Sequence, residues 1–227
     1  MANLKVCVIG LDGMPWKFLD YMIAQGKLPR IQALKEQGAH GDLRSTIPPT
    51  TPVGWKAYST GKNPGKLGVF YWYSLTELRK GRLKFHNSTS YKGKELWELL
   101  SEKGYRCGVI GMPTTYPPRK VNGFMISGIP VTEDQPYTYP PELKEKLVAK
   151  GFRLNIPIPL RLRPGTDSKT ATATYKRAIA ELEKMTEGYC ALARESWEQG
   201  LDFMHLTIEW TDQMLHYLWK PLLDGPE

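Results

Sequence analysis

The sequence predicts an α/β fold with a mostly parallel central sheet. Short runs rich in β-branched and other apolar residues alternate with longer segments whose apolar residues recur at helical spacing. Strands that are apolar at nearly every position are typical of parallel sheets that helices cover on both faces. Strand–helix–strand order then favours right-handed crossovers within one sheet.

The strands are expected where such apolar runs meet turn residues. The first run, VCVIG, stops at Leu11-Asp12-Gly13, and Pro48-Pro49 prevents a later segment from continuing as helix. The expected strands or extended segments are 5–10, 42–47, 70–75, 83–86, 106–112, 124–129 and 201–210.

The helices are expected between these runs. Pro15 and Pro29 suit the first turns of two helices, and glycines follow several apolar stripes as helix stops. The expected helices begin near Pro15 and at 29–38, 53–60, 95–102, 141–149, 171–200 and 211–218. Residues 132–170 are rich in proline, and we interpret them as an inserted or cap-like excursion from a single domain covering 1–227.

Composition narrows the class of protein. The 227 residues include 31 Lys+Arg and 23 Asp+Glu, for a net charge of +8, and the basic residues are scattered. This pattern argues against a dedicated nucleic-acid partner and fits attraction of small anions. The three cysteines form no CxxC pair, and no signal peptide or membrane-length apolar run is readable. We therefore expect a cytoplasmic protein without a membrane partner.

Two groups of metal-competent side chains follow predicted strands. Asp12 comes directly after the first strand, and Asp212 with His216 lies on a helix launched from the last strand. Ligands gather at the carboxyl ends of strands in open α/β sheets, and residues four apart share one helix face. Oxygen and imidazole ligands suit zinc or manganese. The alternatives are that Asp12 caps a helix and that His216 is an ordinary surface histidine.

Thr51 is a third candidate, in the segment IPPTTPVGWKAYSTGK. A threonine beside prolines commonly serves as a turn or cap residue. Its hydroxyl is a poor nucleophile at neutral pH unless a metal ion stabilises the alkoxide. A catalytic Thr51 would therefore need acidic and imidazole ligands nearby.

Several ordered segments carry a resemblance to a known family. VIGLDGMPW, IPPTTPVGWKAYSTGKNPGKLGVF and TDQMLHYLW, with further agreement at GMPTTYPP and VNGFMISGIP, resemble the type I phosphodiesterase/nucleotide pyrophosphatase family of the alkaline phosphatase superfamily, in its prokaryotic cytosolic branch. The resemblance implies a three-layer, alkaline-phosphatase-like sandwich, of which this chain would be an incomplete N-terminal portion.

The resemblance also implies a mechanism and a ligand set. It places the nucleophile at Thr51, which attacks a phosphoryl group and forms a covalent phospho-enzyme, and it places metal ligands at Asp12, Thr51, Asp212 and His216. The implied cofactors are two divalent ions, usually zinc, with manganese as the other option, and the implied substrate is a small phosphate ester or nucleotide.

The sequence departs from the family pattern at several points. Leu67 stands where a loop histidine is common, Tyr71 replaces a frequent polar residue, and the family's downstream Asp-His pair and further histidine have no counterpart before Glu227. The remaining histidines are interpreted as a turn residue, a residue of a basic strand and a core residue; they are His40, His86 and His205. Another superfamily hydrolase, a sulfatase or phosphomutase, or a non-catalytic phospholigand-binding relative therefore stays open.

Overall fold

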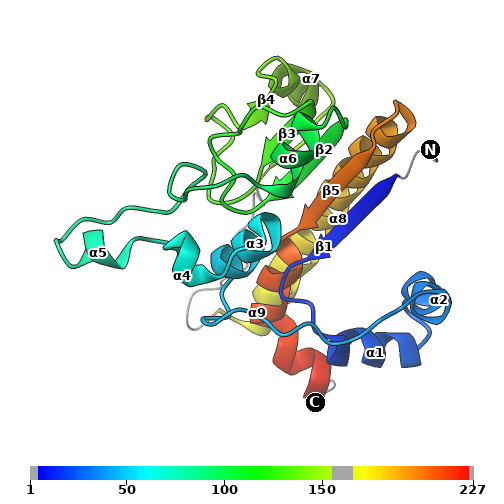
Figure 1. The fold of residues 1–227 in the computed structure, drawn as a ribbon. Coiled ribbons are helices and arrows are strands. Elements are labelled where there is room, and N and C mark those ends of the chain that lie inside the picture. Colours follow the sequence, from blue (N-terminus) through cyan, green and yellow to red (C-terminus); the bar gives the residue numbers. More distant parts are fainter. Residues whose placement is uncertain (1–4, 155–165, 225–227) are drawn as a thin grey trace.

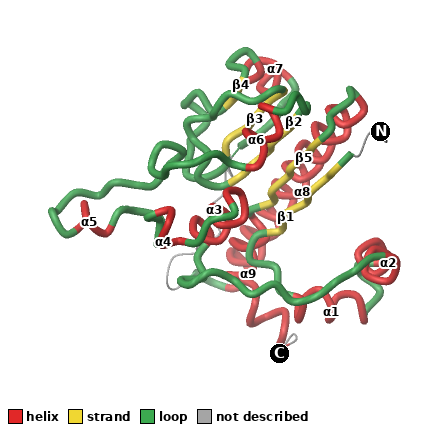
Figure 2. The backbone as a smooth tube through the Cα atoms, in the orientation of Figure 1, coloured by secondary structure: helices red, strands yellow, loops and turns green. Residues whose placement is uncertain are grey.

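The predicted α/β fold is confirmed by a computed structural model, which describes residues 5–154 and 166–224. Its five-stranded sheet has the order β1-β5-β2-β3-β4 (Figures 1 and 2). The strands are β1 (Val6–Leu11), β2 (Cys107–Met112), β3 (Gly123–Ser127), β4 (Thr138–Tyr139) and β5 (Phe203–Ile208). The pairs β1–β5, β5–β2 and β2–β3 are parallel, whereas β4 runs antiparallel to β3.

Helices cover both faces of this sheet, as in a three-layer sandwich. The helices are α1 (Trp16–Ala24), α2 (Pro29–Gln37), α3 (Thr51–Thr60), α4 (Pro64–Leu67), α5 (Leu75–Leu78), α6 (Leu96–Glu102), α7 (Leu143–Ala149), α8 (Ser168–Glu198) and α9 (Trp210–Asp224). The long helix α8 lies along the sheet, while α6 and α3 lie on the opposite side (Figure 1). One apolar cluster joins α8 to the sheet through Leu182 and Tyr189, and another joins α6 to it through Trp97.

The long helix α8 forms where the apolar period predicted it. Asp167 caps its start by accepting a 2.9 Å hydrogen bond from the backbone N–H of Thr170. Ala178, Leu182 and Met185 recur at helical spacing and are buried. The helix therefore places a continuous apolar stripe against the sheet.

Two of the expected strands are wrong. Residues 70–75 and 83–86 contribute only an isolated antiparallel bridge between Tyr73 and Phe85, and the short helix α5 begins at Leu75. No side chain between positions 70 and 87 is buried, so the aromatic residues there have no layer to pack against. This segment instead projects from the body beside α4 (Figure 1).

Other boundaries also differ. Residues 42–47 form no strand. The proline-rich excursion, 132–170, contains β4 and α7, and its residues 155–165 lie outside the described residues. Helix α3 begins at Thr51, two residues earlier than expected, because Pro52 suits the first turn of a helix.

His205 lies in β5, an interior strand of the sheet, and is completely buried, as a core histidine should be. Its ring contacts the rings of Trp55, Tyr58 and Trp97, and its Nε2 has no hydrogen-bond partner among the described residues. Burial disfavours the charged imidazolium and lowers the pKa of His205 to about 4.

This buried histidine should make stability depend on pH. An unfolded histidine has a pKa near 6.5, so between pH about 6.5 and 4 the unfolded chain binds a proton that folded His205 does not. Its contribution is present in full above pH 6.5 and is lost as the pH falls towards 4. Urea unfolding should show that the native chain loses up to about 3 kcal/mol more over this range than a His205→Leu variant.

The exposed His40 provides a control for this measurement. A His40→Leu variant should keep the pH profile of the native chain. Parallel profiles for the native chain and the His205→Leu variant would show that His205 is not the source of the pH dependence.

Candidate active site

Parallel pairing brings the ends of β1 and β5 to one edge of the sheet. The last paired residues are Leu11 and Ile208, and the backbone N–H of Asp12 continues the ladder by donating to the carbonyl of Ile208 at 3.1 Å. The hydroxyl of Thr211 then donates to the carbonyl of Asp12 at 2.7 Å. The turn after β1 is therefore fastened to the start of α9.

Gly13 permits the close approach of Asp212 to this turn. Its φ of 66° lies in the left-handed region, and a Cβ added there would lie 2.4 Å from Oδ1 of Asp212. Only a residue without a side chain fits this position. The two predicted metal-binding carboxylates, Asp12 and Asp212, therefore lie on adjoining segments.

The carboxylate of Asp12 is buried and receives hydrogen bonds from α3. The indole Nε1 of Trp55 donates to its Oδ1 at 3.1 Å, and the Thr51 side chain is a second donor. Burial raises the pKa of Asp12, the bond from Trp55 opposes this rise, and the charge of Asp212 adds to it. The net result is a raised pKa for Asp12. A buried carboxylate without a neighbouring cation is expected to have a raised pKa.

Helix α3 presents one face to this carboxylate. Thr51, Gly54, Trp55 and Tyr58 follow the i, i+3, i+4, i+7 pattern of a single helix face, and all four line a cavity of about 770 Å³. Asp12 and Asp212 line the same cavity. Three of the four predicted site residues thus lie around one space.

The charges around this cavity are unequal. Among the described residues that line it, Arg44 is the only lysine or arginine. Its side chain is exposed and has no ion-pair partner among the described residues. The cavity therefore offers two carboxylates, hydroxyl groups and one uncommitted guanidinium group.

The fourth predicted residue, His216, lies beside the cavity rather than in its lining. Its Nε2 is 3.2 Å from Oδ2 of Asp212, as the i,i+4 spacing on α9 allows. The His216 side chain is 71% exposed and that of Asp212 is 31% exposed. The imidazole could reach an ion held by Asp212 from the solvent side.

Glu209 is a further acidic residue beside Asp12 and Asp212 that the sequence analysis does not identify. It directly follows β5, lies three residues before Asp212, and is buried. Burial, followed by the charges of Asp12 and Asp212, raises its pKa to about 8. The available signal was a carboxylate directly after an apolar strand, in the same position relative to β5 as Asp12 has to β1.

The donor set fits a divalent cation in its chemistry. Converging carboxylates repel each other without a cation, and carboxylate, hydroxyl and imidazole groups are ligands that zinc and manganese accept. Within residues 5–154 and 166–224, however, no group of three or more His, Cys, Asp or Glu side chains could hold a metal ion. The described residues thus offer donor groups that suit a cation, without a cluster of three such side chains.

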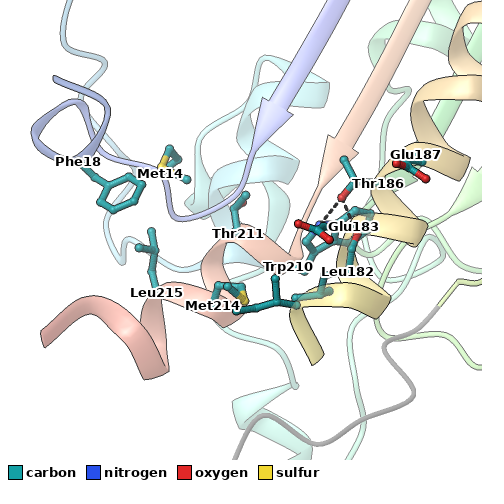
Figure 3. Close-up of a pocket in the computed structure, with 11 residues that line it drawn as sticks. Met14, Phe18, Leu182, Glu183, Thr186, Glu187, Trp210, Thr211, Met214 and Leu215 are labelled. Carbon is teal, nitrogen blue, oxygen red and sulfur yellow. Dashed lines mark hydrogen bonds between the residues drawn. The ribbon is translucent and has the colours of Figure 1, made fainter. Parts of the chain in front are cut away.

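A second pocket lies on the other side of the turn after β1. It has a volume of about 530 Å³ and is walled by apolar side chains of α1, α8 and α9, including Phe18, Leu182 and Met214 (Figure 3). Its described lining has no basic residue, and Glu183 and Glu187 are its charged members. A phosphate group is poorly matched by such walls, which favours the cavity at Asp12 as the functional site.

The fold and the position of this cavity define the structural class of the protein. The protein is an α/β protein with a helix-covered sheet and a polar site at the carboxyl ends of its parallel strands. The chain belongs to the type I phosphodiesterase / nucleotide pyrophosphatase family, whose model matches residues 6–226. Comparison with curated proteins and with solved structures gave no match.

Family membership confirms the coarse functional prediction. It indicates a hydrolase of phosphoester bonds, acting on small phosphoesters or nucleotides, in a family that is generally metal-dependent. In the described part of the chain, no helix combines the length and the apolarity that crossing a bilayer requires.

The contact between Gly13 and Asp212 can be tested with a matched pair of variants. Gly13 and Gly26 have nearly the same φ, 66° and 69°, but nothing lies within 4 Å of a Cβ added at Gly26. Gly26→Ala should cost about 1 kcal/mol from backbone strain alone. Gly13→Ala should cost at least about 1 kcal/mol more, because Asp212 must also move. Equal losses in urea unfolding would contradict this close approach.

Proposed function

We propose that the protein is a phosphodiesterase or nucleotide pyrophosphatase in which Thr51 is the nucleophile. The observation that carries this proposal is the placement of the Thr51 side chain on the cavity face of α3, as a hydrogen-bond donor to buried Asp12. A hydroxyl beside a carboxylate and an ion site is the arrangement that can activate a poor nucleophile.

In the proposed reaction, Oγ of Thr51 forms a bond to phosphorus as its proton passes to solvent water. The bond between phosphorus and the leaving oxygen breaks, and the leaving group departs with the electron pair and takes a proton from water. Water then cleaves the Thr51–phosphate ester and returns the threonine hydroxyl. Trp55 holds Asp12 in place during this sequence, and Arg44 is available to the negative oxygens of the substrate.

Two divalent ions, zinc or manganese, are the proposed cofactors. Asp12 and Thr51 would hold one, while Asp212 and His216 would hold the other. Bound cations lower the pKa of an attacking hydroxyl and offset charge on the phosphoryl group. Cytoplasmic location, in the prokaryotic cytosolic branch of the family, is part of the same proposal.

A non-catalytic phospholigand-binding relative is the second candidate. It is favoured by one observation, the lack of a three-residue His, Cys, Asp or Glu metal cluster among the described residues. The two candidates differ in turnover, so a hydrolysis assay separates them.

The role of Thr51 can be tested with a chromogenic phosphodiester and added zinc or manganese. Thr51→Ala should lower kcat/KM by at least about 10³-fold, since it removes the bond-forming atom, and Thr51→Ser should retain part of the activity. Thr60→Ala, at the far end of the same helix, serves as the control. Equal activity of the native chain and Thr51→Ala would contradict the assignment, and no turnover in any variant would favour the non-catalytic candidate.

The metal proposal predicts opposite effects of one substitution with and without metal. Asp212→Asn removes a negative charge beside Asp12, so the metal-free protein should be as stable as the native chain or more stable. Ligand binding stabilises the native state by RT ln(1 + [L]/Kd). Saturating manganese should therefore raise the Tm of the native chain and raise that of the variant less. Equal increases would show that Asp212 is not a ligand.

A further inference from the structure

The helix that carries Thr51 has a second face, which is buried and half polar. Its buried residues are Pro52, Val53, Lys56 and Ser59, spaced so that they lie away from the cavity face. Val53 packs in a small apolar cluster, but Lys56 and Ser59 are polar and have less than 3% of their surface exposed. Apolar packing alone thus fixes only part of this face.

Both polar residues bind the same atom of Glu95, the residue that precedes α6. Nζ of Lys56 lies 2.6 Å from Oε1 of Glu95, and the hydroxyl of Ser59 donates to that oxygen at 2.9 Å. Glu95 is completely buried and is the N-terminal cap of α6, where it forms a capping box with Glu98. The pair therefore joins α3 to the start of α6 at one point.

Further charged and hydrogen-bonding side chains surround this pair. The Lys56 ammonium donates to the hydroxyl of Tyr91 at 3.1 Å, and Arg119 lies over the same ring and binds Glu98 at 3.0 Å. Burial lowers the pKa of Lys56, while the charge and hydrogen bond of Glu95 raise it. Oε2 of Glu95 has no hydrogen-bond partner among the described residues.

A buried ion pair of this kind is a poor source of stability. Removing two charges from water costs several kcal/mol per ion, and apolar replacements of similar volume are often neutral or stabilising. The best-attested use of such a pair is to fix one arrangement of packed elements among several. Here the elements are α6 and the helix that bears Thr51 and Trp55.

We propose that the Lys56–Glu95 pair positions the active site by fixing the rotation of α3 about its axis. Because Lys56 and Trp55 are adjacent on one rigid helix, a rotation that moves Lys56 away from Glu95 also moves the Trp55 indole away from Asp12. Lys56 and Glu95 are positioning residues that do not line the cavity. Their bearing on catalysis rests on the proposed role of Thr51, whereas their effect on the Trp55–Asp12 bond does not.

The test is the indole N–H signal of Trp55 in a proton–nitrogen NMR spectrum of the full 227-residue chain, assigned with a Trp55→Phe variant. The main variant is the double substitution Lys56→Met and Glu95→Leu, which removes both charges and keeps similar volume. The milder variant is Glu95→Gln, which keeps a hydrogen-bond acceptor. Lys150→Met is the matched control, because it removes an exposed pair with Glu195 at 2.7 Å.

The double variant should stay folded, with a Tm close to that of the native chain. Its Trp55 signal should nevertheless shift upfield, and the indole proton should exchange with solvent at least about tenfold faster, the factor expected for losing a hydrogen bond to a charged group. Glu95→Gln should shift the signal in the same direction and by less, and Lys150→Met should leave it unchanged.

An unchanged Trp55 signal in the folded double variant would overturn the proposal. Loss of cooperative unfolding in both variants would show that the pair serves folding, and would overturn it as well. Because the readout requires no turnover, a failure of the Thr51 assignment in the hydrolysis assay remains a separate result.

Discussion

The parallel pairing of β1 with β5 is the constraint on which the site depends. It joins the first and last described strands and ends at Leu11 and Ile208. The residues that follow each strand must then meet, and Thr211 binds the carbonyl of Asp12 across 199 positions of sequence. Without this register, the carboxylates of Asp12 and Asp212 would belong to unrelated surfaces.

The close approach of these acidic side chains is electrostatically unfavourable, and the hydrogen bonds of the site offset only part of this repulsion. Burial and the charge of Asp212 raise the pKa of Asp12, and burial and the charges of Asp12 and Asp212 raise the pKa of Glu209. The hydrogen bonds from Trp55 and Thr51 oppose the rise at Asp12, but they carry no positive charge. A site that gathers two carboxylates, Asp12 and Asp212, in a partly buried cavity is electrostatically prepared for cations.

Much of the fold followed from local sequence patterns. The apolar runs predicted all the parallel strands. β2 and β5 are buried at every position, as such runs indicate, whereas the edge strand β1 leaves Val6 and Ile9 exposed. The same reasoning failed at 70–75 and 83–86, where residues such as Tyr73 and Phe85 have strand propensity but meet no apolar layer. Propensity describes the backbone conformation that a residue favours. Whether a surface is present for that residue to pack against depends on the rest of the chain.

The candidate site, like the fold, could be predicted from the sequence only in part. Strand ends and the Asp-x3-His spacing pointed to Asp12, Asp212 and His216. Thr51 was a further candidate from its own segment, and the resemblance gave it the role of nucleophile. The structure brings Asp12, Thr51 and Asp212 around one cavity, while their roles stay predictions. The bond from Trp55 to Asp12 and the pair of Lys56 with Glu95 join positions 43 and 39 residues apart, so no local pattern signals them.

The edge position of β1 has a consequence for synthesis of the protein. Its strand partner, β5, begins at Phe203, nearly the full length of the chain later. At ribosomal rates of about 5–20 residues per second, the apolar strand emerges roughly 10–40 s before β5 exists. During that interval the other strands can pair among themselves, but β1 cannot join the sheet. The earliest of the described strands is therefore among the last to join the sheet, and the nascent chain must keep it from aggregating until then.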